Sequence, residues 1–285
     1  MAYGILNADV IGTSVVGSNL GAGNATLMKN RLIDAGFTIN QRGYVSGTAL
    51  SSGTYAHDRW KAGSGGCTYT FTQLSTGVPI VITITAGSLQ QVIEGANIPD
   101  GGTFTLSWTG TAQARFNGGT YGSSPLAVTG LTAGSNCTIE FNTGTCSFPQ
   151  LEVGSSATGF EYRQYQQELA LCQRYYYKAL AGGSVSTFGA GVALTTTNAV
   201  GVTMFPVTMR TSPTALEQSG TATDYRIYGT AGGTTCNAVP IIAANTGSPF
   251  SVSTSFTVAS GLTAGQGQYI QSATTNGYLA WSAEL

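Results

Sequence analysis

The chain has 285 residues, of which 8% are charged and 40 are glycine, and its formal net charge is −1. This charge balance, without clusters of Lys and Arg, excludes the electrostatics that binding to nucleic acid or to an anionic membrane surface requires. Hydrophobic residues make up 42% of the chain, which is typical of a folded protein and not of a disordered one. The length suits two domains, each large enough to bury its own core.

Five cysteines are spread along the chain without a CxxC motif, which argues against a zinc site or a redox motif: Cys67, Cys137, Cys146, Cys172 and Cys236. Cys137 and Cys146 flank a turn-rich hairpin and could be bridged, but buried free thiols are the favoured state. The N-terminus lacks a basic segment followed by a long apolar run, and no stretch approaches about eighteen apolar residues. We therefore expect synthesis in a cytosol, no membrane insertion and no cofactor.

The first part of the chain predicts an extended arm followed by a β domain. Residues 1–30 combine glycines with short apolar pairs, which indicates an arm that becomes ordered only against a neighbour. Residues 31–160 contain short alternating segments at roughly ten-residue spacing, which predicts a β-sandwich or jelly roll. The expected strands include Phe37–Gln41, Ala56–Trp60, Thr68–Thr72, Val78–Ala86, Thr103–Trp108, Ala112–Phe116, Leu126–Leu131, Cys137–Asn142 and Ser147–Val153.

One amphipathic helix is predicted at residues 161–182, between two β-rich parts. Apolar and aromatic residues recur there at steps of three and four, and Lys178 followed by a Gly pair suits a helix C-terminus. The second β part, residues 183–285, predicts a sandwich-like domain with a thin core, which favours support from another subunit. Its expected strands are Val192–Thr195, Gly201–Arg210, Asp224–Tyr228, Ala238–Ala243, Phe250–Val258, Gln268–Ile270 and Tyr278–Glu284. The fold class is mostly β.

Several longer stretches point to a family. The chain opens on MAYGILNADVIGTS and continues with MKNRLIDAGFTINQRGYVSG and SGTYAHDRWKAG. LQQVIEGANI, QLEVGSSATGFEYRQYQQELALCQRYYYKA and a terminal NGYLAWSAEL follow. In content and order these stretches resemble tailed-bacteriophage virion proteins of the tail-fibre or carbohydrate-binding-domain family.

The resemblance implies a sugar-binding-type jelly roll at about residues 31–160, a joint helix, a C-terminal β domain and a place on a phage particle. It also implies a homotrimer, and residues 1–30 are then the arm that attaches to other virion proteins. Two departures matter: Gly159 stands where the family often has Pro, and the loops between Ile98 and Cys137 are short. Because ligand contacts lie in such loops, no sugar site is carried over residue by residue.

Candidate catalytic groups have ordinary structural explanations. Adjacent residues on a strand point to opposite faces, so His57 and Asp58 do not form an acid–base pair there. Trp60 is expected to pack inward and Arg59 to pair at the surface. A hydrolase would need paired carboxylates, for which the candidates are Glu94 and Asp100. Asp100 stands before two glycines, which is typical of a turn. A structural calcium is an open alternative, although no spaced acidic loop supports it. Its oxygen ligands would come from Asp58, Glu140, Glu152 and Glu161.

Two groups of side chains are predicted to make contacts with partners. Sugar rings stack on exposed aromatic faces beside amide and guanidinium donors, which makes four residues the ligand-binding candidates: Trp108, Arg115, Asn117 and Tyr121. The aromatic helix surface is the predicted oligomer interface, although packing inside the chain is an equal alternative: Tyr162, Tyr165, Leu169, Tyr175, Tyr176 and Tyr177.

These observations predict a non-enzymatic virion protein, tail-fibre-like, that contacts host-surface glycans. The alternative is a capsid decoration or head-fibre protein that stabilises the particle without binding a receptor. A glycan depolymerase is disfavoured, because paired carboxylates and a long repetitive β-helix are missing from the sequence pattern.

Overall fold

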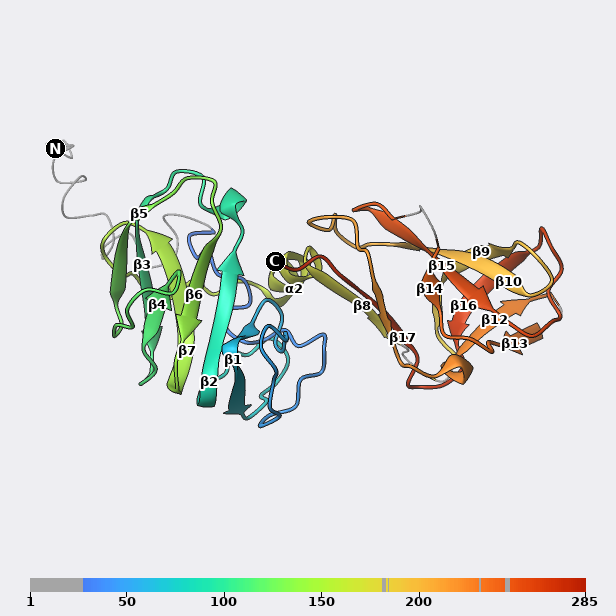
Figure 1. Ribbon diagram of the computed structural model, residues 1–285, viewed down its shortest axis with the longest axis horizontal. Helices are drawn as coiled ribbons and strands as arrows, with labels where there is room; N and C mark the ends of the chain where they lie inside the picture. The colour runs from blue at the N-terminus through green and yellow to red at the C-terminus, as the bar shows by residue number, and fades with distance from the viewer. Residues whose placement is uncertain (1–27, 181–182, 184, 231, 244–246) are drawn as a thin grey trace, which may run out of the picture. The chain divides into compact units, whose positions relative to one another are not determined.

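The computed structural model describes residues 28–285 apart from 181–182, 184, 231 and 244–246 (Figure 1). The chain divides into two compact units: the first is Met1–Leu169 with Leu285, and the second is Ala170–Glu284. The predicted arm, residues 1–30, lies outside the described residues except for positions 28–30. Both units are mostly β, and α2 is the single α-helix in the described part of the chain, so the predicted fold class is confirmed. Among the described residues, no helix has both the length and the apolar character needed to cross a membrane.

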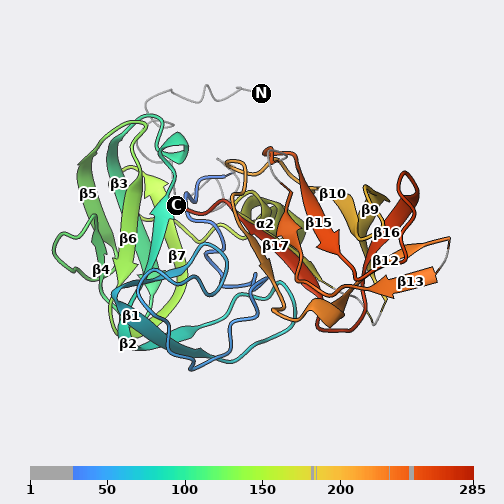
Figure 2. The same cartoon turned by 45° about the vertical axis from the view of Figure 1, so that its right-hand side comes forward.

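The first unit contains a seven-stranded antiparallel sheet (Figures 1 and 2). Its strands are β1 (Lys61–Phe71), β2 (Ile82–Ile93), β3 (Gly102–Thr109), β4 (Ala114–Phe116), β5 (Leu126–Leu131), β6 (Cys137–Phe141) and β7 (Gly144–Val153), with a short 3-10 turn η2 (Gly95–Asn97) after β2. The order is β4-β6-β2-β7-β3-β5, and β1 also pairs with β2. One half of β2 pairs with β7 and the other half with β6, so two sandwich-like faces share this strand.

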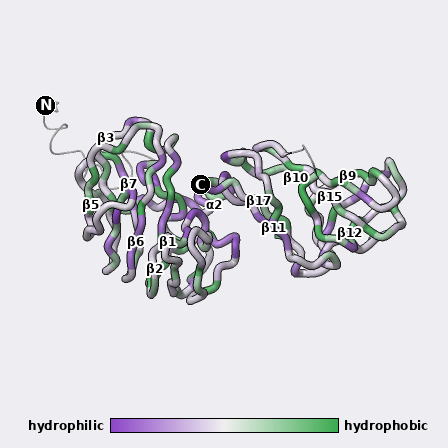
Figure 3. The backbone as a smooth tube through the Cα atoms, in the orientation of Figure 1, coloured by the Kyte–Doolittle hydropathy of each residue, from purple (hydrophilic) through white to green (hydrophobic). Residues whose placement is uncertain are grey.

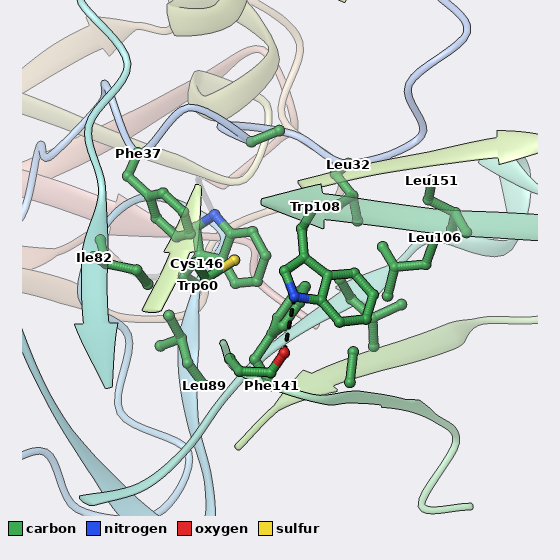
Figure 4. Close-up of a cluster of buried hydrophobic side chains, with 14 of the residues drawn as sticks. Leu32, Phe37, Trp60, Ile82, Leu89, Leu106, Trp108, Phe141, Cys146 and Leu151 are labelled. Carbon is green, nitrogen blue, oxygen red and sulfur yellow. Dashed lines mark hydrogen bonds between the residues drawn. The ribbon is translucent and has the colours of Figure 1, made fainter. Parts of the chain in front are cut away.

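The buried core of the first unit combines aromatic rings with aliphatic side chains (Figure 4). Trp60 is 0% exposed, and its ring centroid lies 4.9 Å from that of Phe37. Trp108 meets Phe141 edge to face, with 5.2 Å between ring centroids. Figure 3 shows the underlying pattern, in which apolar and polar residues alternate along the strands. Three expected strands of this unit differ from the prediction: Phe37–Gln41 and Ala56–Trp60 are irregular chain, and the strand expected at Val78–Ala86 begins only at Ile82.

A partly buried polar network joins residues 28–32 to the segment before α2. The Glu161 carboxylate accepts hydrogen bonds from the backbone N–H groups of Met28 and Asn30, at 2.5 and 2.7 Å. Arg163 donates to the carbonyl oxygens of Leu32, at 2.9 Å, and Asn30. Glu161 and Arg163 therefore fix residues 28–32 against the end of the first unit.

The predicted helix at 161–182 is wrong at both ends. α2 spans Tyr165–Gln173, and the chain then forms β8 (Tyr176–Leu180), which pairs with β17 (Tyr278–Ser282). In this pairing the Tyr177 ring stacks on Trp281 with 5.9 Å between centroids and 10° between planes. Aromatic residues favour strands when a cross-strand partner is present, and that partner lies about a hundred residues away in the sequence. The boundary between the two units falls within α2.

The second unit contains a seven-stranded and a three-stranded antiparallel sheet. The strands are β9 (Thr187–Ala193), β10 (Asn198–Met204), β11 (Leu216–Gln218), β12 (Tyr225–Gly229), β13 (Gly232–Thr235), β14 (Ile241–Ile242), β15 (Ser251–Thr257) and β16 (Gly267–Ser272), with a 3-10 turn η3 (Ala222–Asp224) before β12. The larger sheet has the order β13-β12-β16-β9-β10-β15-β14, and β11-β17-β8 form the smaller one (Figures 1 and 2). Trp281, Tyr225 and Phe256 lie in its buried hydrophobic cluster. The strand expected at Gly201–Arg210 ends at Met204, before Pro206.

Candidate ligand-binding site

Two of the four predicted sugar-binding residues have structural roles. Trp108 is 7% exposed, and its indole N–H donates to the Ala112 carbonyl oxygen at 2.9 Å. Asn117 has a positive φ of 48°, and its side-chain oxygen accepts a hydrogen bond from the Thr138 N–H at 2.8 Å. Trp108 therefore belongs to the core and does not offer the exposed ring that the prediction required, whereas Asn117 is exposed and holds the turn after β4.

The other two predicted residues, Arg115 and Tyr121, come together on the outer side of β4 and β6. The Arg115 guanidinium lies 4.6 Å from the Tyr121 ring centroid and forms a 2.7 Å ion pair with Glu140. Ser88 donates to the other oxygen of the Glu140 carboxylate. Burial raises the pKa of Tyr121, and the charge of Glu140 adds to this effect. Because these polar groups already satisfy one another, a ligand would have to displace internal bonds to use them.

The His57–Trp60 segment is a buried turn and not a strand with a surface arginine. His57, Asp58 and Arg59 are each at most 1% exposed. Arg59 has a φ of 71° and donates to the Val92 carbonyl oxygen at 2.6 Å. The His57 Nδ1 lies 2.6 Å from the Tyr69 hydroxyl, and burial lowers the pKa of His57 to about 4. No substrate can reach these groups without opening the core.

The remaining candidate carboxylates are dispersed. Glu94 precedes η2 and is partly buried, while Asp100 is exposed in the turn before β3. Of the calcium candidates, Glu152 accepts hydrogen bonds from the Thr158 N–H and hydroxyl, at 2.8 and 2.6 Å, and Glu140 is paired with Arg115. In the described chain, no group of three His, Cys, Asp or Glu residues is arranged to hold a metal ion.

The cysteines are all free and buried, so the favoured thiol state is confirmed over a Cys137–Cys146 bridge. Burial raises the pKa of the Cys137 thiol to about 11 and those of Cys67 and Cys236 to about 12. Because the thiolate is the reactive form, these thiols are poor nucleophiles at neutral pH.

Half of the predicted oligomer interface is packed inside the chain. Tyr175 and Tyr176 are each 1% exposed, and the Tyr176 hydroxyl donates to Glu217 at 2.9 Å. Tyr177 is the residue that stacks on Trp281. The burial of these three tyrosines thus needs no partner. Tyr162 is 68% exposed, and Tyr165 and Leu169 are partly exposed, so this part of the surface is free in the single chain.

An open groove of about 620 Å³ lies in the second unit, where no binding residue was predicted. Its lining, which we call the tyrosine groove, consists of Ala190, Gly191, Tyr228, Gly229, Thr230, Gly267, Gln268 and Tyr269. Tyr228 on β12 and Tyr269 on β16 are directly opposite each other across the strand pair, and they are 41% and 55% exposed. Their strand neighbours Ile227 and Ile270 are buried on the other face.

The tyrosine groove combines the two features that sugar recognition uses. Exposed aromatic rings offer flat apolar faces, and hydroxyl groups at their rims offer hydrogen bonds. The alternation in YRIY and QYIQ does predict one outward tyrosine on each strand. Their adjacency could not be predicted, because it depends on pairing between segments about forty residues apart.

These two mostly β units place the chain in the class of β-rich proteins with sandwich-like sheets, and the second unit has an aromatic surface groove. Comparison of the chain with protein-family models and with curated proteins finds no match.

Proposed function

We propose that this chain is a non-enzymatic structural protein of a bacteriophage virion, tail-fibre-like, that contacts glycans on the host surface. The observation that carries the glycan contact is the tyrosine groove, in which two exposed rings stand side by side on adjacent strands. The resemblance of the sequence to phage virion proteins supports the place on the particle. Residues 1–30 are then the attachment arm, and the protein is made in the host cytoplasm before assembly.

The burial of the candidate catalytic groups supports the proposal of a non-enzymatic role. The single histidine of the chain, His57, is fully buried next to Asp58, which is also fully buried. A general base must come within hydrogen-bond reach of the proton that it removes, and these groups are enclosed. Incubation with capsular or lipopolysaccharide chains is therefore expected to release no oligosaccharide.

The direct test of the proposed function is competition for adsorption. We expect purified protein, mixed with host cells before infectious phage, to reduce phage adsorption, because it occupies the same surface glycans. The Tyr228→Ala/Tyr269→Ala double variant should lose this effect, and the matched Tyr228→Phe/Tyr269→Phe variant should keep it. If the unaltered protein leaves adsorption unchanged, the alternative role as a capsid decoration or head-fibre protein is favoured.

The proposed assembly is a homotrimer that uses the exposed remainder of the predicted interface. Tyr162 is 68% exposed although its ring meets Phe160 edge to face, with 5.0 Å between centroids. Light scattering is expected to give about three times the chain mass of 29.2 kDa, because a large exposed aromatic is favourably buried at an interface. The Tyr162→Asp variant should shift the mass towards the monomer. A stable monomer of the unaltered protein at micromolar concentration would contradict this prediction.

A further inference from the structure

We propose that the tyrosine groove binds a neutral, extended oligosaccharide that lies across strands β12, β16, β9 and β10. This inference rests on the proposed glycan contact and adds the ligand class and the direction of the chain. Like the proposed function, it places the contact in the second unit, whereas the sequence resemblance implied the first.

The direction follows from the register of the four strands. Tyr228 is opposite Tyr269, Tyr269 is opposite Ala190, and Ala190 is opposite Val202, so these residues form one row perpendicular to the strands. All four are exposed on the outer face of the sheet. Neighbouring strands lie about 4.8 Å apart, which is comparable with the length of one sugar unit. A linear chain of sugars along the row thus meets one side chain per unit.

The shape of the groove leaves room for such a chain. Gly267 is on β16 two residues before Tyr269, so it faces the same side of the sheet. Where a Cβ would stand at Gly267, no atom lies within 4 Å. The space beside the Tyr269 ring is therefore open, and Thr230 is exposed at the edge of the groove. Both tyrosines are exposed beside this space, and Ala190 next to Tyr269 in the row has a much smaller side chain.

The charge of the groove favours a neutral ligand. All of the lining residues are uncharged. Arg226 is a cation beside the groove, two residues before Tyr228 on the same face of β12, and its guanidinium carbon lies 5.4 Å from the Tyr228 ring centroid. Its Nε donates to the Gln271 side chain on β16 at 2.9 Å. An acidic sugar in the groove would have to draw Arg226 away from these partners, whereas a neutral sugar requires no cation.

The inference is tested by measuring binding to glycans of defined length and charge. The probes are neutral hexose oligomers of one to six units, with β-1,4-glucose, β-1,3-glucose and β-1,4-mannose linkages, and uronic-acid oligomers of matching length. Isothermal titration and saturation-transfer NMR give the affinity. We expect binding of at least one neutral series to strengthen by about tenfold or more from one to four units. The affinity should be the same at low and high salt, because no charges are paired.

Four variants assign the binding to the row. Tyr269→Ala should weaken neutral-oligomer binding by about tenfold or more, and Tyr269→Phe should retain most of it, because the stacking face remains. Gly267→Leu should also block binding by filling the space beside Tyr269. Val202→Lys should weaken binding of the longest oligomers and leave the shortest unchanged. These positions are on the surface, so thermal unfolding should stay close to that of the unaltered protein.

The outcomes separate this inference from the proposed function. If glycans bind but Tyr269→Ala and Gly267→Leu have no effect, the inference is overturned and the contact lies outside the groove, while a protein that blocks adsorption keeps its proposed function. If only uronic-acid chains bind, the inference is overturned and the proposed function stands. If no neutral series binds, the inference is overturned, and a protein that also fails to block adsorption loses its proposed function. A change of oligomeric state in Tyr269→Ala without glycan binding would make this face a self-association surface and likewise overturn the inference.

Discussion

Replacement of Trp60 by alanine is expected to lower the free energy of unfolding by about 3–5 kcal/mol. The side chain is 0% exposed and packs against Phe37, and its indole N–H donates to the Asp34 carbonyl oxygen at 2.9 Å. The substitution opens a cavity where these rings meet, and it leaves a buried carbonyl oxygen without its donor. A loss of this size is a large part of the roughly 5–15 kcal/mol that a typical protein has in total.

The measurement is guanidinium unfolding followed by circular dichroism. Trp60→Phe should cost clearly less than Trp60→Ala, since phenylalanine fills most of the volume and loses only the hydrogen bond. Tyr228→Ala serves as the control for removing a large aromatic side chain from the surface, and it should change the stability by less than about 0.5 kcal/mol. A cost below about 1 kcal/mol for Trp60→Ala would show that Trp60 is not a central core residue.

The regular strands could be predicted because alternation is a local property. The segment Thr103–Trp108 alternates apolar and polar residues, and β3 occupies Gly102–Thr109. The same alternation places Phe104, Leu106 and Trp108 on one buried face. Trp108 lies two residues after Leu106 and four after Phe104, so the same alternation predicts that its side chain points into the core and is not available to bind sugar.

The end of the helix and the groove could not be predicted because they depend on distant pairing. A run of three tyrosines fits a helix period as well as a strand, and the choice is made by Trp281, which stacks on Tyr177. In the same way, Tyr228 and Tyr269 become neighbours only through the pairing of β12 with β16. Local periodicity shows which face a residue occupies but not which segment lies beside it.

The stability of the protein is expected to fall by up to about 3 kcal/mol through His57 alone when the pH drops from 6.5 to 4. His57 is 0% exposed among the rings of Phe37, Tyr69 and Phe71, and burial lowers its pKa from 6.5 to about 4. Between these two values the unfolded chain binds a proton that the folded chain does not. Acidification therefore favours the unfolded state across this window, and the effect is absent above it.

Asp34 is a second buried group, and its titration changes the stability in the opposite sense to that of His57. The two contributions must therefore be measured separately. Burial, and then the charges of Asp58 and Glu168, raise the pKa of Asp34 well above its usual value. The folded state then binds the Asp34 proton more tightly than the unfolded state. This contribution is greatest at low pH and is lost as the pH rises through the folded pKa. Comparison of the protein with a His57 variant at each pH cancels the Asp34 contribution.

His57→Gln is the suitable variant, because glutamine stays neutral and can still bond the Tyr69 hydroxyl that lies 2.6 Å from the His57 Nδ1. We expect the variant to be less stable than the unaltered protein at pH 7, since the ring contacts are lost, and the difference to shrink as the pH falls towards 4. Because the chain has a single histidine, its NMR titration gives the folded pKa directly. A titration near 6.5, or a constant stability difference between the two proteins from pH 7 to pH 4, would mean that water and protons reach the imidazole in the folded state, and the enclosed core described around Trp60 would then be wrong at this turn.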